Sequence, residues 1–320
     1  MKCLKPNMIV EGKFKHFNQK ILEQNPESFI IPCGHCLSCK MNKAREWSAK
    51  CVFESYIHKY NYFLTLTYED QNLTFKDKNY IDLTGELRAE PTLVKKDLQN
   101  FIKRLRKRHW LDYNKWNTLK YLACGEYGEI TKRPHYHMIL FSDYPIPDLT
   151  QFKRNHDKDI LFTSNYLDRI WGFGFTTIAE FTPATAGYVA RYTIKKLYGS
   201  TKKEYLKAGI YNKEPEFLLC SKKPALGYAY FDQNKDLYLK TDNIYFYNKE
   251  KLVSSKLPKS WVLKCTPDQQ KIIVDQRKKN TQRNYINYLN VNNEKNYLNL
   301  LAKEKLIVNE KAKKLIKSSI

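Results

Sequence analysis

Residues 121–141 read YLACGEYGEITKRPHYHMILF, and the fold is decided around this stretch. Its two ends, Tyr121–Tyr127 and Tyr136–Phe141, are rich in apolar and aromatic residues, which favours β-strands. The residues between them include Gly128 and Pro134, which are typical of a turn. The stretch therefore predicts two antiparallel strands joined as a hairpin.

Two histidines lie on the second strand of this hairpin, at positions 135 and 137. Residues two apart on a strand face the same side, so both imidazoles project from one face. Glu126 on the first strand has the parity of Cys124, and closing the hairpin brings its carboxylate to the imidazoles. Glu129 is close enough in sequence to compete with Glu126. A surface hairpin whose histidines, His135 and His137, have no function is the simpler alternative.

Two imidazoles and a carboxylate can hold a divalent cation and leave positions for a substrate oxygen. Zinc hydrolases, iron oxygenases with a facial triad, and phosphodiester nucleases with an ion of the Mg²⁺ or Mn²⁺ class all use such a set. Zinc hydrolases usually carry their ligands on an H-E-x-x-H helix, and this motif is missing from the sequence.

A helix expected over residues 183–198, with Thr182 as its cap, favours the nuclease. At 100° per residue, Tyr188, Tyr192 and Lys195 share one face, and the apolar residues occupy the opposite one. A phenol with a pKa near 10 is a poor nucleophile at neutral pH, so a nearby cation would favour phenolate or offset transition-state charge. The bland alternative is a partly buried aromatic pair.

Cysteines crowd near the N-terminus, where Cys33, Cys36 and Cys39 form overlapping C-x-x-C units. Thiolates at this spacing can share one tetrahedral Zn²⁺, which requires a fourth ligand. Cys3 is the first candidate for it, because the arm could fold back, and His35 is the second. Reduced cysteines without a metal are the alternative.

The composition points to a polyanionic partner. The 320 residues carry 56 basic and 33 acidic side chains, a net charge of +23, and each Lys or Arg placed on a phosphate releases a counterion. With 42% hydrophobic residues the chain should fold. No apolar run is long enough for a membrane helix, no signal peptide is recognisable, and no G-x-x-x-x-G-K-[ST] motif occurs, so we expect an intracellular protein without an ATP-driven helicase.

The remaining elements are predicted more coarsely. Helices are expected over Asn42–Tyr60 and Thr92–Trp110, the latter with a strongly basic outer side, and a strand over Tyr62–Tyr68. From Thr266 onward 12 basic residues face 5 acidic ones, and a helical stripe begins at Leu298. The sequence divides into a Cys-rich zinc arm (1–40), a nuclease core (41–200), a β-rich accessory segment (201–265) and a basic, Lys/Asn-rich helical tail (266–320).

The ordered motifs resemble those of a known family. They are FLTLT at 63–67, CGEYG at 124–128, RPHYH at 133–137 and YVARYTIKK at 188–196, with PCGHCLSC at 32–39 and DLQNFIKRLR at 97–106. In order and spacing, residues 1–230 resemble the HUH endonucleases, and within them the replication initiators of gokushovirus-type microviruses. The tail after residue 265 matches no such pattern.

This resemblance implies an α+β fold, with a central antiparallel sheet that is flanked by helices and carries the histidines on a middle strand. It implies that His135, His137 and Glu126 bind Mg²⁺ or Mn²⁺, that Tyr188 and Tyr192 are nucleophiles, and that Lys195 assists them. The activity implied is nicking and rejoining of single-stranded or origin DNA in rolling-circle replication, through a 5′-phosphotyrosyl link. The host would supply helicase and polymerase, and the site of action would be the cytoplasm of an infected bacterium.

Contacts to DNA are expected from basic residues of two helices and the hairpin turn. These are Lys103, Arg104, Arg106, Lys107, Arg108, Arg133, Arg191 and Lys196. A non-catalytic, zinc-containing DNA-binding protein is a competing hypothesis, as are a relaxase and a transposase of the HUH group. The cysteine cluster favours the phage initiators over the last two.

Overall fold

The structure is a computed structural model. It describes residues 2–25, 27–75, 80–81, 87–88, 90–116, 119–128, 130–155, 159–195, 213–248, 250–291 and 296–317, with the backbone alone at 80–81, 87–88, 191–195, 291 and 314–317. The chain forms two compact units. One consists of residues 50–230, and the other joins both ends of the chain, residues 1–49 and 231–320.

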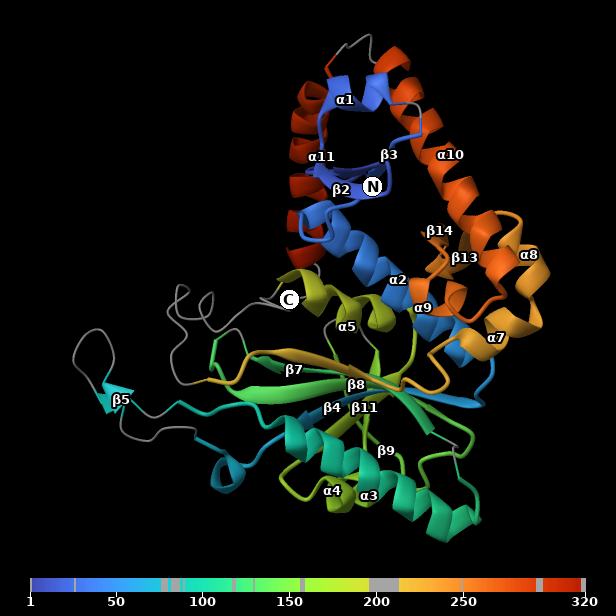
Figure 1. The fold of residues 1–320 in the computed structure, drawn as a ribbon. Coiled ribbons are helices and arrows are strands. Elements are labelled where there is room, and N and C mark those ends of the chain that lie inside the picture. The colour runs from blue at the N-terminus through green and yellow to red at the C-terminus, as the bar shows by residue number, and fades with distance from the viewer. Residues whose placement is uncertain are drawn as a thin grey trace. The chain divides into compact units, whose positions relative to one another are not determined.

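A seven-stranded sheet forms the centre of the 50–230 unit (Figure 1). All neighbouring strands in it are antiparallel. In spatial order they are β12 (Phe217–Cys220), β7 (Leu119–Tyr127), β8 (Pro134–Ser142), β4 (Tyr60–Thr67), β11 (Thr176–Glu180), β10 (Ile160–Thr163) and β9 (Thr150–Arg154). The predicted α+β architecture, with an antiparallel sheet flanked by helices, is confirmed.

The predicted hairpin is confirmed as β7 and β8, and it lies inside the sheet. In its register Glu126 lies opposite His135, and Cys124 lies opposite His137. Gly125 is needed here because a Cβ at this position would approach the Phe217 ring of the neighbouring strand to 2.9 Å. The glycine of the CGEYG motif thus allows β12 to cover the edge of β7.

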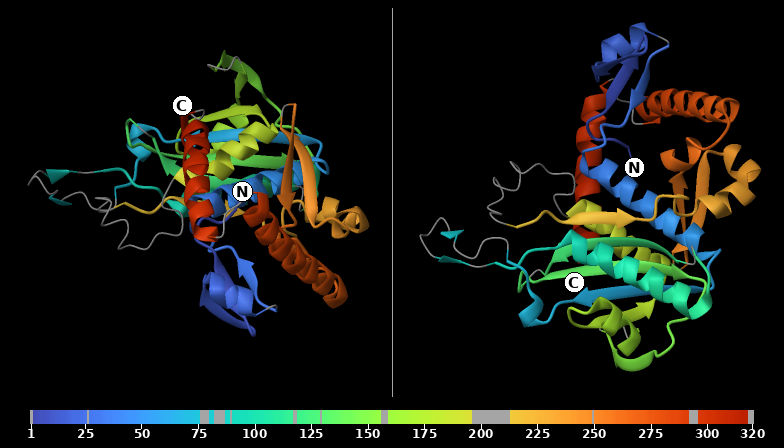
Figure 2. Two further views of the ribbon diagram at one scale, coloured as in Figure 1. Left: turned by 90° about the horizontal axis from the view of Figure 1, so that it is seen from above. Right: turned by 60° about the horizontal axis from the view of Figure 1, so that its bottom comes forward.

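Helices cover the two faces of this sheet. Helices α3 (Lys95–Tyr113) and α4 (Asn165–Trp171) cover one face, and α5 (Pro183–Lys195) covers the other, as Figures 1 and 2 show. The hydrophobic core lies under α3, where Phe101 and Leu105 pack with the alternate strand residues that face them. Under α5 the contacts are made by small or branched residues, which are fully buried: Ala186, Val189 and Ala190. The predicted helix over Thr92–Trp110 exists with its bounds moved by three residues.

Residues 1–31 are more regular than the loop-rich arm that the sequence predicted. Strands β1 (Asn7–Val10), β2 (Lys13–His16) and β3 (Phe29–Ile31) form an antiparallel sheet in the order β2-β1-β3, and α1 (Gln19–Gln24) lies between the last two in sequence. Glu11 and Gly12 both have positive φ, the backbone that a two-residue hairpin turn demands. Glu-Gly is a rare sequence for that turn, so the hairpin was missed.

Two long helices, α10 (Pro267–Val291) and α11 (Tyr297–Lys317), belong to the same unit and flank this small sheet (Figures 1 and 2). Tyr285, Tyr297 and Leu301 form a buried cluster with Phe17 and Ile30. Helix α2 (Leu37–Ser55) begins five residues before the predicted start at Asn42, because it follows directly on the turn that holds the cysteines.

The other elements are short. They are η1 (Asp70–Asn72), β5 (Tyr80–Ile81), β6 (Leu87–Arg88), α7 (Tyr228–Gln233), α8 (Lys235–Leu239), β13 (Asn243–Asn248), β14 (Lys251–Lys256) and α9 (Lys259–Val262). Among the described residues, no helix has the length and apolar character needed to cross a membrane.

Candidate active site

Three side chains converge on the face of the sheet that α5 covers. Nε2 of His135 lies 2.7 Å from Oε1 of Glu126, and Nε2 of His137 lies 2.8 Å from the same oxygen. The two imidazole rings stand almost perpendicular, with their centroids 4.9 Å apart. The carboxylate expected from strand parity is therefore the one that meets both histidines, and Glu129 lies outside the described residues.

The site is largely shielded from water. Glu126 is 3% exposed and His137 is 7% exposed, whereas His135 is only half-buried. Burial alone would raise the pKa of Glu126, but hydrogen bonds from the two histidines outweigh it and lower the pKa to about 2. The site thus keeps a negative charge beside two imidazoles at neutral pH, and His135 is the side through which a ligand can enter.

Each imidazole is fixed by a contact at its other nitrogen. Nδ1 of His135 donates to the carbonyl oxygen of Arg133 at 3.2 Å, and Nδ1 of His137 lies 3.0 Å from the hydroxyl of Thr65. Phe63 stacks on the His137 ring at 5.3 Å. The sequence analysis missed these supports, although the alternation of the FLTLT strand already put Phe63 and Thr65 on one face.

These contacts test whether a cation fits. A carbonyl can only accept, so His135 donates from Nδ1, and in a neutral imidazole Nε2 then carries a lone pair. Such a nitrogen can approach the carboxylate of Glu126 to 2.7 Å only with a second proton or a cation between them. The donor atoms of Glu126, His135 and His137 all lie within 4.8 Å of one another, and the set fits a divalent cation.

Helix α5 places a tyrosine beside this set. Its first turn is held by Thr182 and Thr185, each of which donates its backbone N–H to the other's hydroxyl. The Tyr188 ring lies edge-on to the His137 ring, with centroids 5.3 Å apart. The backbone of α5 continues through Tyr192 and Lys195, whose side chains lie outside the described part of the structure.

The basic residues expected to contact DNA are spread over both faces. Helix α3, with Lys103, Arg106, Lys107 and Arg108, lies on the face opposite the glutamate and histidines. Arg104 of that helix donates to the carbonyl oxygens of Ile170 and Trp171 at 2.7 and 2.8 Å, so it holds α4.

Arg133 is the expected DNA contact nearest the histidines. Its guanidinium pairs with Asp70 and donates to the carbonyl of Tyr68 at 2.7 Å. It therefore ties the hairpin turn to the end of β4. Of the remaining two, the side chain of Arg191 and the whole of Lys196 lie outside the described part of the chain.

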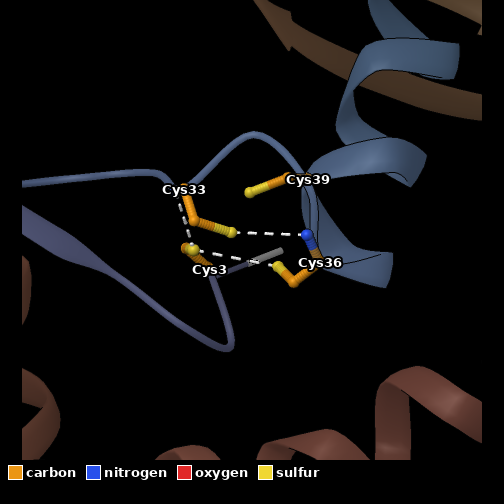
Figure 3. Close-up of side chains that lie close together, drawn as sticks. All are labelled: Cys3, Cys33, Cys36 and Cys39. Carbon is orange, nitrogen blue, oxygen red and sulfur yellow. Dashed lines mark hydrogen bonds between the residues drawn. The ribbon is translucent and has the colours of Figure 1, made fainter. Parts of the chain in front are cut away.

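The second candidate donor set consists of Cys3, Cys33, Cys36 and Cys39 (Figure 3). Their Sγ atoms all lie within 4.8 Å of one another. Cys3 is thus brought to the three clustered cysteines. His35 enters the cluster only through its backbone N–H, which donates to the sulfur of Cys33 at 3.4 Å.

Comparison with known proteins points in one direction. The family model for the replication-associated protein ORF2 matches residues 61–197, which include the glutamate, both histidines and α5. The chain is 32% identical over 272 residues to replication-associated protein ORF2 of Spiroplasma virus 4, covering 81% of this chain and 78% of that protein.

Two further relatives carry similar names. Replication-associated protein VP4 of Bdellovibrio phage phiMH2K is 31% identical over 238 residues, 73% of this chain and 68% of that protein. Replication-associated protein ORF4 of Chlamydia phage 1 is 28% identical over 220 residues, 68% of this chain and 50% of that protein. No solved structure shows significant similarity.

Proposed function

This chain belongs to the ORF2 family of replication-associated proteins, and on that premise we propose that it nicks and rejoins DNA at a phage replication origin. The membership confirms the resemblance to gokushovirus-type initiators that its motifs had indicated. The observation that carries the proposal is the convergence of Glu126, His135 and His137 with a tyrosine beside them. We further propose that the sheet is the central sheet of the HUH endonuclease fold.

An ion of the Mg²⁺ or Mn²⁺ class is proposed for the glutamate and histidines. Bound there, it would polarise the scissile phosphate and offset the charge that develops on its oxygens. His137 and Glu126 are buried and held by neighbouring groups, so they need little rearrangement to bind it. Half-buried His135 is the ligand nearest to solvent and hence to an incoming strand.

The strand transfer uses the phenol of Tyr188 or Tyr192. Its oxygen attacks the phosphorus and forms an O–P bond, while the bond from phosphorus to the 3′ oxygen breaks. The phenol gives up its proton, and the leaving oxygen takes one and becomes a 3′-hydroxyl. Lys195 would offset the negative charge of the phenolate. The product is a 5′-phosphotyrosyl link with a primer end.

Two tyrosines allow the cycle to close. When the fork returns to the origin, the first tyrosine still holds the 5′ end, so a second phenol must cut the new junction. The 3′-hydroxyl released by this cut attacks the first phosphotyrosine and forms a circle. Residues four apart on a helix are about 5–6 Å apart at Cβ, so both can reach one phosphate. The link conserves the bond energy, and joining needs no ATP.

Other proteins and surfaces take part in this proposal. Host helicase and polymerase would unwind and extend the DNA in the cytoplasm of the infected bacterium. The exposed cations of α3 would bind DNA away from the cut bond, because the sheet separates them from the glutamate and histidines. Arg104 would act mainly by holding α4.

A covalent adduct tests the proposal. Labelled single-stranded oligonucleotides tiled over the phage origin are incubated with the protein and Mn²⁺ and separated on a denaturing gel. We expect a protein–DNA adduct that needs the metal. Tyr188→Phe and Tyr192→Phe should each retain some nicking but lose efficient circle formation, and the double variant should form no adduct. Metal-independent cleavage, or binding without any adduct, would contradict the proposal.

A further inference from the structure

The four cysteines come from three separate places in the unit that joins the chain ends. Cys3 precedes β1, Cys33 and Cys36 lie in the turn after β3, and Cys39 lies in the first turn of α2. We propose that they hold one Zn²⁺, and that this centre keeps the small sheet β1–β3 docked on helices α10 and α11.

The distances fit a tetrathiolate metal site. With Zn–S bonds of about 2.3 Å, two sulfurs of a tetrahedron lie about 3.8 Å apart. The Sγ atoms of Cys3 and Cys36 are 3.8 Å apart, well beyond the bond length of a disulfide. By contrast, Cys51, Cys124 and Cys265 are buried and belong to no group of metal donors in the described part of the chain.

Backbone N–H groups point at the sulfurs as they would at thiolates. Cys33 donates to Sγ of Cys3 at 3.2 Å, Cys36 donates to Sγ of Cys33 at 3.3 Å, and Leu4 donates to Sγ of Cys36 at 3.3 Å. Hydrogen bonds of this kind stabilise the negative charge on metal-bound sulfur. Gly34, with a φ of 81°, gives the turn the left-handed backbone that brings these groups together.

The segment fixed by Cys3 is also the segment that contacts the C-terminal helices. The hydroxyl of Ser38 donates to the carbonyl of Lys2, and Nζ of Lys2 lies 2.7 Å from the centre of the Tyr288 ring of α10. At the far end of the sheet, the Tyr285 hydroxyl donates to Glu23 at 3.2 Å. The Tyr297 backbone donates to the side chain of Gln19 at 2.9 Å.

The docked sheet needs such a staple. Its strands have three or four residues each, and small sheets of this kind are marginal without additional support. A metal that joins Cys3 to Cys33 closes the chain around the whole sheet and removes much of the entropy of its unfolded state. Loss of the metal should therefore release β1–β3, and with it the contacts of Tyr285 and Tyr297.

Metal content tests the site. Protein purified under reducing conditions is analysed by elemental mass spectrometry. We expect one zinc per chain in the wild type and in His135→Ala/His137→Ala, which separates this centre from the proposed nuclease site. Cys33→Ser should lose the zinc, and Cys220→Ser, a cysteine outside the cluster, should keep it. Wild-type protein without zinc, or Cys33→Ser with the wild-type content, would overturn the assignment.

Hydrogen exchange tests the docking without any cysteine substitution. The His135→Ala/His137→Ala protein is stripped with a strong chelator, and exchange is followed before and after zinc is restored. We expect residues 7–31 and 285–301 to lose protection on stripping and to regain it with zinc, while residues 119–142 stay protected. Unchanged protection of residues 285–301 would overturn the docking role.

Discussion

The two metal-donor sets are built in opposite ways. Glu126, His135 and His137 lie on adjacent inner strands of a seven-stranded sheet, whose register alone brings them together. The four cysteines lie on an arm, a turn and a helix end, and they are spread along the sequence from Cys3 to Cys39. A sheet-borne set is fixed before any ion binds, whereas a set on loops is ordered by the ion it holds. The first suits catalysis and the second suits folding.

The largest effect should come from removing the sheet-borne ligands. His135→Ala/His137→Ala should reduce DNA cleavage by at least about 10³-fold, since metal stabilisation of a scissile phosphate contributes several kcal/mol. Binding to DNA should remain largely intact, because affinity comes mainly from lysines and arginines elsewhere. Cleavage rates and filter binding on the same oligonucleotide measure both. Cleavage by the double variant at the wild-type rate would show that these histidines serve no catalytic purpose.

A smaller effect is expected from the group that orients His137. Thr65→Val removes the hydroxyl 3.0 Å from Nδ1 while keeping the shape of the side chain. Affinity for Mn²⁺ should fall about 10–100-fold, as for other groups that orient metal ligands. Titration followed by electron paramagnetic resonance measures it, and Thr65→Ser should restore the wild-type value. Equal affinities of the Val and Ser variants would mean that the hydroxyl plays no part.

The opposite face of the same strand should behave differently. Tyr136 lies between the two histidines but points into the core, where its hydroxyl is 2.7 Å from that of Tyr68 and donates to the carbonyl of Val94 at 3.0 Å. Tyr136→Phe should lower the free energy of unfolding by about 1–3 kcal/mol through unmade hydrogen bonds. Mn²⁺ affinity should not change. A variant of normal stability with weakened metal binding would show that the two faces are not independent.

The smallest effect concerns a histidine that serves folding. His58 contacts Asp143 at 2.7 Å and Glu54 at 3.0 Å. Burial lowers the pKa of His58, but the two carboxylates outweigh it, and the net shift is upward. Its protonated form is thus favoured in the folded state, a contribution that is complete below the unfolded pKa of about 6.5 and lost as pH rises through the folded value.

The unfolding free energies of wild type and His58→Gln should therefore differ most near pH 6 and converge toward about pH 8.5. Denaturant titrations across this range measure the difference. A gap that widens with pH would show that His58 is neutral in the folded protein.

The sheet-borne set could be predicted from the sequence because its information is local. Strand parity placed Glu126 with His135 and His137, since a hairpin of known register needs no distant contact. The supports Thr65 and Phe63 come from another strand, and their pairing with β8 could not be derived from spacing. The join of residues 1–49 with 231–320 could not be predicted either, because it depends on packing between the two ends of the chain.

The central claim is that tyrosines of α5 carry the covalent link, and the sequence allows a direct test. Trypsin cleaves after Arg169 and Arg191, which puts Tyr188 and Tyr192 on different peptides. The adduct formed with Mn²⁺ is digested with nuclease and trypsin and analysed by mass spectrometry. We predict a nucleotide phosphate on peptide 170–191, on peptide 192–195, or on both. An adduct carried by neither peptide would contradict the account.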